Sequence, residues 1–106
     1  RVKGKYKMAY TYTASVSIPE AVETDVDFIE WIQEQMESND YHAISVWLSV
    51  DQFSTVTTYD REITENELIA TRTFSNEADA TQNMAELKEL FKCDTVVPVY
   101  SDITEV

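Results

Sequence analysis

The sequence predicts a single α+β domain in which two helices cover one face of an antiparallel sheet. Hydrophobic and aromatic residues recur at every second position in four segments, which is the period of a strand with one buried face. Two other segments carry hydrophobic residues three or four positions apart, which is the period of a helix. The segments follow the order strand, helix, strand, strand, helix, strand, and this order predicts two split βαβ units.

The first strand is expected at residues 6–18, where large side chains alternate with small or polar ones. The helix after it has two candidate starts, which are Pro19 and a capping box formed by Thr24 and Asp27. It is expected to end at residues 38–40. Its predicted buried stripe consists of Val22, Val26, Phe28, Ile29, Ile32 and Met36.

The second strand is expected at residues 42–50, with Ile44 and Trp47 on opposite faces because successive strand residues alternate in direction. The threonine-rich run at residues 53–63 also favours extended backbone. It either continues the second strand through a bulge or forms a short extra strand. After a turn at Glu65 and Asn66, residues 68–74 are expected to form the third strand.

The second helix is expected to be capped by Ser75 or Asn76. Its predicted buried stripe consists of Ala80, Met84, Leu87 and Phe91. A fourth strand is expected at residues 97–103, at a sheet edge or a bulge, because Pro98 cannot donate to a strand ladder. Since βαβ crossovers are right-handed, both helices are expected on one face, which is the ferredoxin-like plan.

Composition and charge argue against several classes of function. The chain has 20 Asp and Glu against 8 Lys and Arg, and its formal net charge is −12. An acidic surface repels nucleic-acid phosphates and anionic lipids, so neither nucleic acid nor a membrane is expected as a partner. No apolar run approaches the length of a membrane span, and a cytoplasmic location is expected. Cys93 is the only cysteine, which excludes an internal disulfide, and no metal or other cofactor is expected.

Residues 1–7 are interpreted apart from the rest of the chain. They carry four of the eight cations, and residues 9–60 carry none. We interpret them as a basic leader, or as residues that precede a native start at Met8. Residues 8–106 are then the single α+β domain.

Three short segments resemble the dimeric α+β barrel superfamily, which includes antibiotic biosynthesis monooxygenase-like and stress-responsive A/B barrel proteins. Residues 16–20 and 28–32 are similar to the first strand and helix of these proteins, and residues 72–78 are similar to their third strand entering the second helix. The resemblance implies a homodimer with two facing sheets, and it implies no activity. Haem-degrading relatives carry an axial histidine on the second helix, and residues 77–92 contain none. Quinone-forming relatives use aromatic and amide side chains with a histidine or arginine, for which the sequence shows no matching set. No catalytic residue is therefore assigned.

The candidate ligand-binding residues are expected where the helices cover the sheet. They are Tyr10, Tyr12, Phe28, Ile32, His42, Arg72 and Met84. The two tyrosine hydroxyls and His42 would supply polar groups at one end of an apolar slot. Arg72 is in phase with Leu68 and Phe74, so on a covered face it needs a carboxylate or an anionic ligand. Packed aromatic residues, a strand-end histidine and an arginine that reaches solvent are the structural alternatives.

Three functions stay open at this point. The favoured one is a homodimer that binds an apolar, fatty-acid-like small molecule with one polar or anionic head between helices and sheet. The second is a cofactor-independent monooxygenase that acts on an aromatic substrate, and the sequence does not decide whether the protein is an enzyme. The third is a structural or regulatory subunit that binds another protein. Tyr41, Trp47 and Tyr100, expected on the uncovered sheet face, are the residues that favour a dimer.

Overall fold

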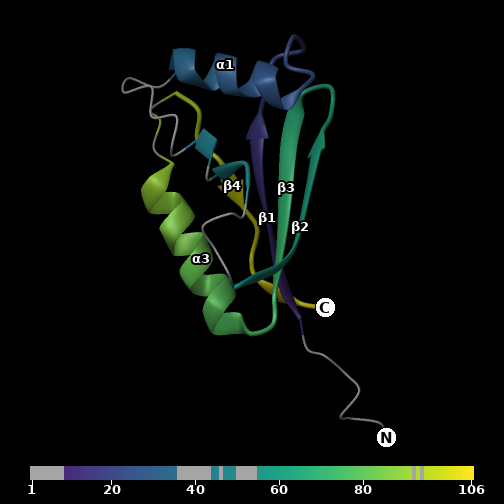
Figure 1. Cartoon of the computed structure of the whole chain (residues 1–106), viewed down its shortest axis with the longest axis vertical. Coiled ribbons are helices and arrows are strands. Elements are labelled where there is room, and N and C mark those ends of the chain that lie inside the picture. The colour runs from purple at the N-terminus through teal and green to yellow at the C-terminus, as the bar shows by residue number, and fades with distance from the viewer. Residues whose placement is uncertain (1–8, 36–43, 46, 50–54, 92, 94) are drawn as a thin grey trace, which may run out of the picture.

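The computed structural model describes residues 9–35, 44, 45, 47–49, 55–91, 93 and 95–106. Within them the chain is α+β, with a five-stranded antiparallel sheet and two helices of 11 and 14 residues (Figure 1). The elements are β1 (Tyr10–Ser17), α1 (Asp25–Gln35), β2 (Val56–Ile63), β3 (Glu67–Phe74), α3 (Glu77–Leu90), β4 (Val99–Tyr100) and β5 (Thr104–Glu105).

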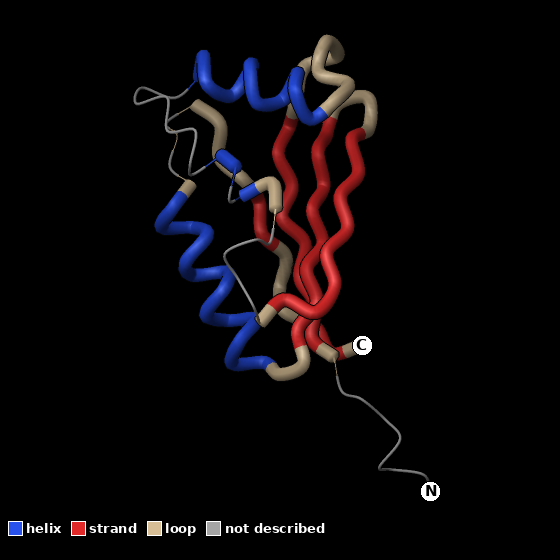
Figure 2. The backbone as a smooth tube through the Cα atoms, in the orientation of Figure 1, coloured by secondary structure: helices blue, strands red, loops and turns tan. Residues whose placement is uncertain are grey.

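The sheet has the strand order β2-β3-β1-β4. The short strand β5 also pairs with β1, opposite Tyr10 and Thr11, whereas β4 pairs opposite Ala14 and Ser15. All of these pairs are antiparallel. This order is compatible with the ferredoxin-like plan, in which each βαβ unit has a strand of the other unit inserted between its own two strands. Figure 2 shows α1 crossing one end of the sheet while α3 runs alongside it.

The predicted alternation in the two central strands is confirmed. In β1 the residues Tyr12, Ala14 and Val16 are buried, and in β3 every second residue from Leu68 to Phe74 is buried. These side chains share one face because successive residues in a strand point to opposite faces. The other face of these two strands carries mostly hydroxyl side chains, including the cross-strand pair Thr11 and Thr73.

The predicted second strand at residues 42–50 is wrong wherever the structure describes it. Ile44, Ser45 and Trp47 are helical, and the Leu48 amide donates to the Ile44 carbonyl at 3.0 Å. Ile44, Trp47 and Leu48 stand at positions i, i+3 and i+4, which lie on one face of a helix, and all three are buried. The threonine-rich run provides the second strand instead, as β2, and a bulge between Val56 and Thr58 interrupts its pairing with β3.

The expectation that Trp47 lies on the uncovered face is also wrong. Its side chain is fully buried, and its ring lies 6.2 Å from Phe28 and 5.2 Å from Phe91. Its indole N–H donates to the Tyr100 hydroxyl at 3.1 Å, so Tyr100 also packs inward. Tyr41 lies outside the described residues. The homodimer stays a prediction, and Trp47 no longer supports it.

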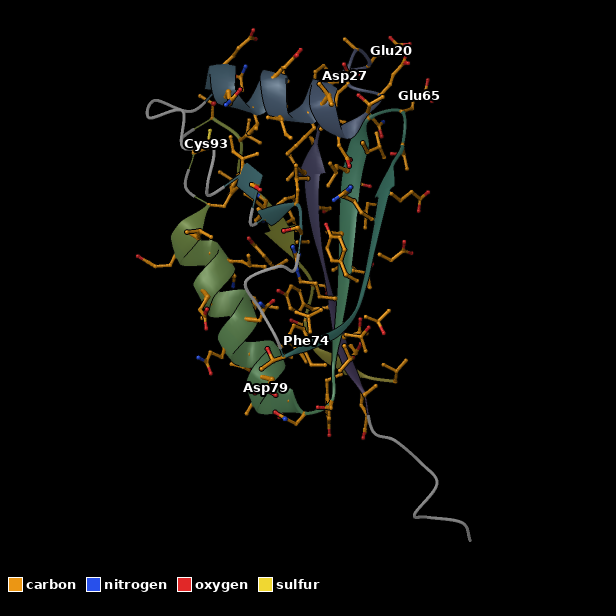
Figure 3. All side chains as sticks on the ribbon, in the orientation of Figure 1. Glu20, Asp27, Glu65, Phe74, Asp79 and Cys93 are labelled. Carbon is orange, nitrogen blue, oxygen red and sulfur yellow. The ribbon has the colours of Figure 1, made fainter. Side chains whose placement is uncertain are left out.

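Both helices begin at capping residues that were predicted. Thr24 and Asp27 form a reciprocal box, in which the Asp27 amide donates to the Thr24 hydroxyl and the Thr24 amide donates to the Asp27 carboxylate, each at 3.1 Å. The prediction that Pro19 starts the helix is wrong, because α1 begins at Asp25. The prediction that Val26 belongs to the buried stripe is also wrong, because Val26 is 62% exposed. Asn76 caps α3 by accepting from the Asp79 amide at 2.8 Å. Figure 3 shows Asp27 and Asp79 near the starts of their helices, where a negative charge interacts favourably with the helix dipole and stabilises the helix.

Thr24→Ala is expected to lower the free energy of unfolding by about 1 kcal/mol, because the variant loses the acceptor for the Asp27 amide. Urea denaturation measures the change. Thr81→Ala is the matched control, since Thr81 is an exposed residue within α3, where alanine is the better helix former. Equal losses of stability in the two variants would contradict the role of the capping box.

Candidate functional site

Arg72 occupies the centre of the covered sheet face. It lies in β3, opposite Tyr12 of β1 on one side and Tyr59 of β2 on the other. The strand alternation turns its side chain to the same face as Leu68 and Phe74, and it is 0% exposed. A charged side chain is almost never fully buried unless it is paired, which makes Arg72 the unusual residue of this interior.

Only one of the three guanidinium nitrogens of Arg72 donates a hydrogen bond to a described residue. Nη2 donates to the Trp47 carbonyl and, at 3.4 Å, to the Ser49 carbonyl. The guanidinium carbon lies 4.8 Å from the centroid of the Tyr59 ring, which adds a cation–π contact. Nε and Nη1 are buried without a hydrogen-bond partner. Among the described residues, no carboxylate forms an ion pair with Arg72.

A second unsatisfied donor belongs to Asn83, which lies on the buried side of α3. The Tyr12 hydroxyl donates to Asn83 Oδ1 and so links β1 to α3. Asn83 is 2% exposed, and its Nδ2 has no partner. Asn83 is not among the candidate residues predicted from the sequence. The available signal was its position between Ala80 and Leu87, because the three residues follow the helical spacing of one buried stripe.

The electrostatics keep this interior positive and rich in donors. Burial raises the pKa of the Tyr12 hydroxyl well above its usual range, and the positive charge of Arg72 opposes this rise. Burial also raises the pKa of Tyr100, against the Trp47 hydrogen bond and the charge of Arg72. Both phenols are therefore neutral at physiological pH, while a guanidinium stays charged. We call Arg72, Asn83 and Tyr12 the donor cluster.

Three side chains of the sheet hold the backbone that covers the donor cluster. Arg72 binds the carbonyls of residues 47 and 49, and both Tyr59, at 2.8 Å, and Arg61 donate to the Leu48 carbonyl. Arg61 also pairs with Asp25, at the start of α1. These carbonyls follow a helical turn, whose last carbonyls lack partners within the turn itself. The turn is thereby fastened over the sheet.

The seven predicted site residues are only partly brought together. Tyr12 and Arg72 are cross-strand neighbours and both belong to the donor cluster. Phe28 and Ile32 are the buried residues of α1, and the ring of Phe28 contacts Trp31 and Trp47 rather than Tyr12. Met84 is partly buried on α3, Tyr10 lies at the end of β1 opposite Phe74, and His42 lies outside the described residues.

The donor cluster is buried beneath the surface. Surface grooves of about 390, 300 and 210 Å³, formed by described residues, lie beside α1 or the loop before it. None is lined by the donor cluster or by a predicted site residue. Within the described part of the chain, no group of three or more His, Cys, Asp or Glu is placed to hold a metal ion.

Comparisons with protein-family models, with curated proteins and with solved structures give no match. The likeness to dimeric α+β barrel proteins therefore rests on short segments and on a strand order that is compatible with it. No helix in the described ranges is long and apolar enough to cross a membrane.

The raised pKa of Tyr12 predicts how alkali affects stability. The Tyr12 hydroxyl ionises near pH 10 in the unfolded chain and at higher pH in the folded protein, so stability is full below about pH 10 and falls above it. Tyr12→Phe is expected to flatten this fall by up to about 1.4 kcal/mol per pH unit, because one proton fewer is lost on unfolding. Urea denaturation at increasing pH measures both slopes, and identical slopes would contradict the assignment.

Proposed function

We propose that this protein is a small-molecule-binding domain and that its donor cluster receives the polar head of the ligand. The observation that carries the proposal is the state of Arg72. It is fully buried, and two of its three guanidinium nitrogens have no hydrogen-bond partner. A ligand that accepts hydrogen bonds would satisfy them.

Burying the charge of Arg72 costs free energy, and the contacts of its guanidinium offset part of that cost. Burial of an ion costs several kcal/mol even after relaxation. The carbonyl bonds offset about 1.5–3 kcal/mol each, and the contact with the Tyr59 ring offsets about 2 kcal/mol. Each buried donor that stays unpaired costs about 1–3 kcal/mol more. The two unpaired nitrogens are the part of this cost that no contact of Arg72 offsets, and a bound acceptor would offset it.

The surroundings of the donor cluster favour a ligand with an apolar body. Tyr12 stacks on Phe74 with ring centroids 5.8 Å apart and planes within 9°, and Trp47 and Phe91 line the same core. Ligand sites in proteins are mostly apolar, with a few convergent polar groups that orient the ligand. Since the donor cluster is enclosed, binding requires the turn that contains Trp47 to separate from the sheet. We expect association to be slow for this reason.

A pair of arginine substitutions tests this function. Arg72→Met is expected to fold, to melt at the same temperature or higher because a buried charge is replaced by an apolar group, and to lose at least about tenfold in affinity for anilinonaphthalene sulfonate. Arg61→Met is the matched control. It loses an ion pair and a carbonyl contact at a partly exposed site, so it should melt lower and keep the probe. Probe fluorescence and thermal melting measure the outcomes.

Two results would contradict the proposal. The first is that the native chain shows no saturable fluorescence with this probe. The second is that Arg72→Met melts well below the native chain while probe affinity is unchanged, since Arg72 would then serve only to hold the carbonyls of residues 47 and 49.

A second candidate function, oxygenation of a phenolic substrate, is favoured by the composition of the same interior. An arginine, the Asn83 amide and the Tyr12 and Trp47 rings are enclosed together, and quinone-forming relatives of the resembled superfamily use a set of this kind. In that reaction a phenol and O₂ give a quinone and water, and Arg72 would stabilise the phenolate. Binding is preferred because the raised pKa keeps the Tyr12 hydroxyl protonated near neutral pH, so that it cannot take the proton of the substrate.

An oxygen electrode separates the two functions. If the protein is an oxygenase, 1-naphthol should be consumed with one O₂ per quinone formed, and Arg72→Met should abolish the reaction. If the native chain binds naphthol without oxygen uptake above the buffer rate, the oxygenase is excluded for this substrate and the binding function stands.

A further inference from the structure

We infer that the head of the ligand is a carboxylate with a single negative charge, and that Asn83 is the second residue that selects it. This inference rests on the proposed binding function and specifies its ligand class. It follows from the kind of groups that the donor cluster leaves unpaired, from its charge and from how the Asn83 amide is held.

All of the unpaired atoms in the donor cluster are donors. Nε of Arg72 carries one N–H, Nη1 carries two, and Nδ2 of Asn83 carries two more. Asn83 Oδ1 accepts from Tyr12, and the carbonyls of Trp47 and Ser49 accept from Nη2. An ammonium group only donates hydrogen bonds and would meet the positive charge of Arg72. A carboxylate only accepts, at about four lone-pair positions.

The charge of the site favours one negative charge on the ligand. Arg72 is the one cation of the donor cluster, and no carboxylate among the described residues neutralises it. A monoanion leaves the interior neutral. A phosphate monoester, with nearly two negative charges at neutral pH, would leave a net negative charge buried inside a chain of net charge −12.

The orientation of Asn83 is set by Tyr12. The Tyr12 hydroxyl donates to Oδ1 of Asn83, and this bond leaves the two Nδ2–H groups to donate elsewhere. Tyr12 is held in turn by its stacking on Phe74. Tyr12 is therefore a positioning residue, whereas Arg72 and Asn83 are expected to contact the ligand.

Four probes with one naphthalene body test the ligand class. They are 2-naphthoate, 2-naphthamide, 2-naphthyl phosphate and 2-naphthylmethylamine, titrated into the full chain by calorimetry near neutral pH. We expect naphthoate to bind at least about tenfold tighter than the neutral amide, which has the same shape, and tighter than the phosphate, while the amine should not bind. Naphthoate affinity should fall in acid as its carboxylate takes a proton.

Asn83→Asp tests the site itself. The new carboxylate would supply the missing acceptor for Arg72 and repel an anionic head. We expect naphthoate binding to fall at least about a hundredfold and the melting temperature to rise by about 5 °C. Asn66→Asp is the matched control, since it adds the same charge at an exposed turn and should change neither quantity appreciably.

The outcomes separate this inference from the function on which it rests. If naphthamide binds as tightly as naphthoate and both are lost in Arg72→Met, the binding function stands and the carboxylate inference is overturned. If Asn83→Asp keeps the native affinity for naphthoate, the role of Asn83 is overturned. If none of the four probes binds the native chain but anilinonaphthalene sulfonate does, the carboxylate inference is overturned and the binding function stands. If that probe also fails, both are overturned.

Discussion

The guanidinium of Arg72 needs hydrogen-bond acceptors in an interior made mostly of hydrocarbon and aromatic rings, and several features of the fold supply them. Tyr59, on the neighbouring strand, places its ring beside the charge. The turn that contains Trp47 directs backbone carbonyls at the sheet, where Arg72 and Arg61 bind them. Because a buried charge tolerates few rearrangements, these contacts fix the position of the turn relative to β2 and β3.

Backbone carbonyls supply acceptors to a buried guanidinium in a different way from a carboxylate. The end of a helical turn leaves carbonyls without internal partners, and they carry partial rather than full negative charge. They can therefore hold Arg72 without neutralising it. The chain contains 20 acidic residues, yet among the described residues the ion pair between an arginine and one of them, Arg61 with Asp25, lies at the partly exposed rim. The contrast between the rim pair and the unneutralised interior charge is what singles out Arg72 as a candidate for ligand binding.

The sequence was sufficient for the parts of this structure that depend on one segment at a time. Alternation put Tyr12 on the face expected under the helices and Arg72 in phase with Leu68 and Phe74, and the capping box at Thr24 was visible from the spacing of two residues. Ile44, Trp47 and Leu48 were misread, because hydrophobic residues also stand at every second position from Ile44 to Val50, and this is the period of a strand. Contacts between segments were beyond reach. The pairing of Arg72 with Tyr59 depends on the bulge in β2, and the bond from Tyr12 to Asn83 depends on how α3 is placed against β1.

The nitrogens of Arg72 fall into two groups, one that holds the covering turn and one that has no partner. Nη2 holds the carbonyls of the covering turn, whereas Nε and Nη1 are the nitrogens left for a ligand. Under the proposed function, the turn would have to open for the ligand to enter, and it could then close again with the same Nη2 contacts because the ligand head would use other nitrogens. An arginine already paired with a protein carboxylate would have to exchange one ion pair for another, with little net gain. In this protein the ligand would add partners to a charge that lacks them, so binding and closure of the turn would reinforce each other.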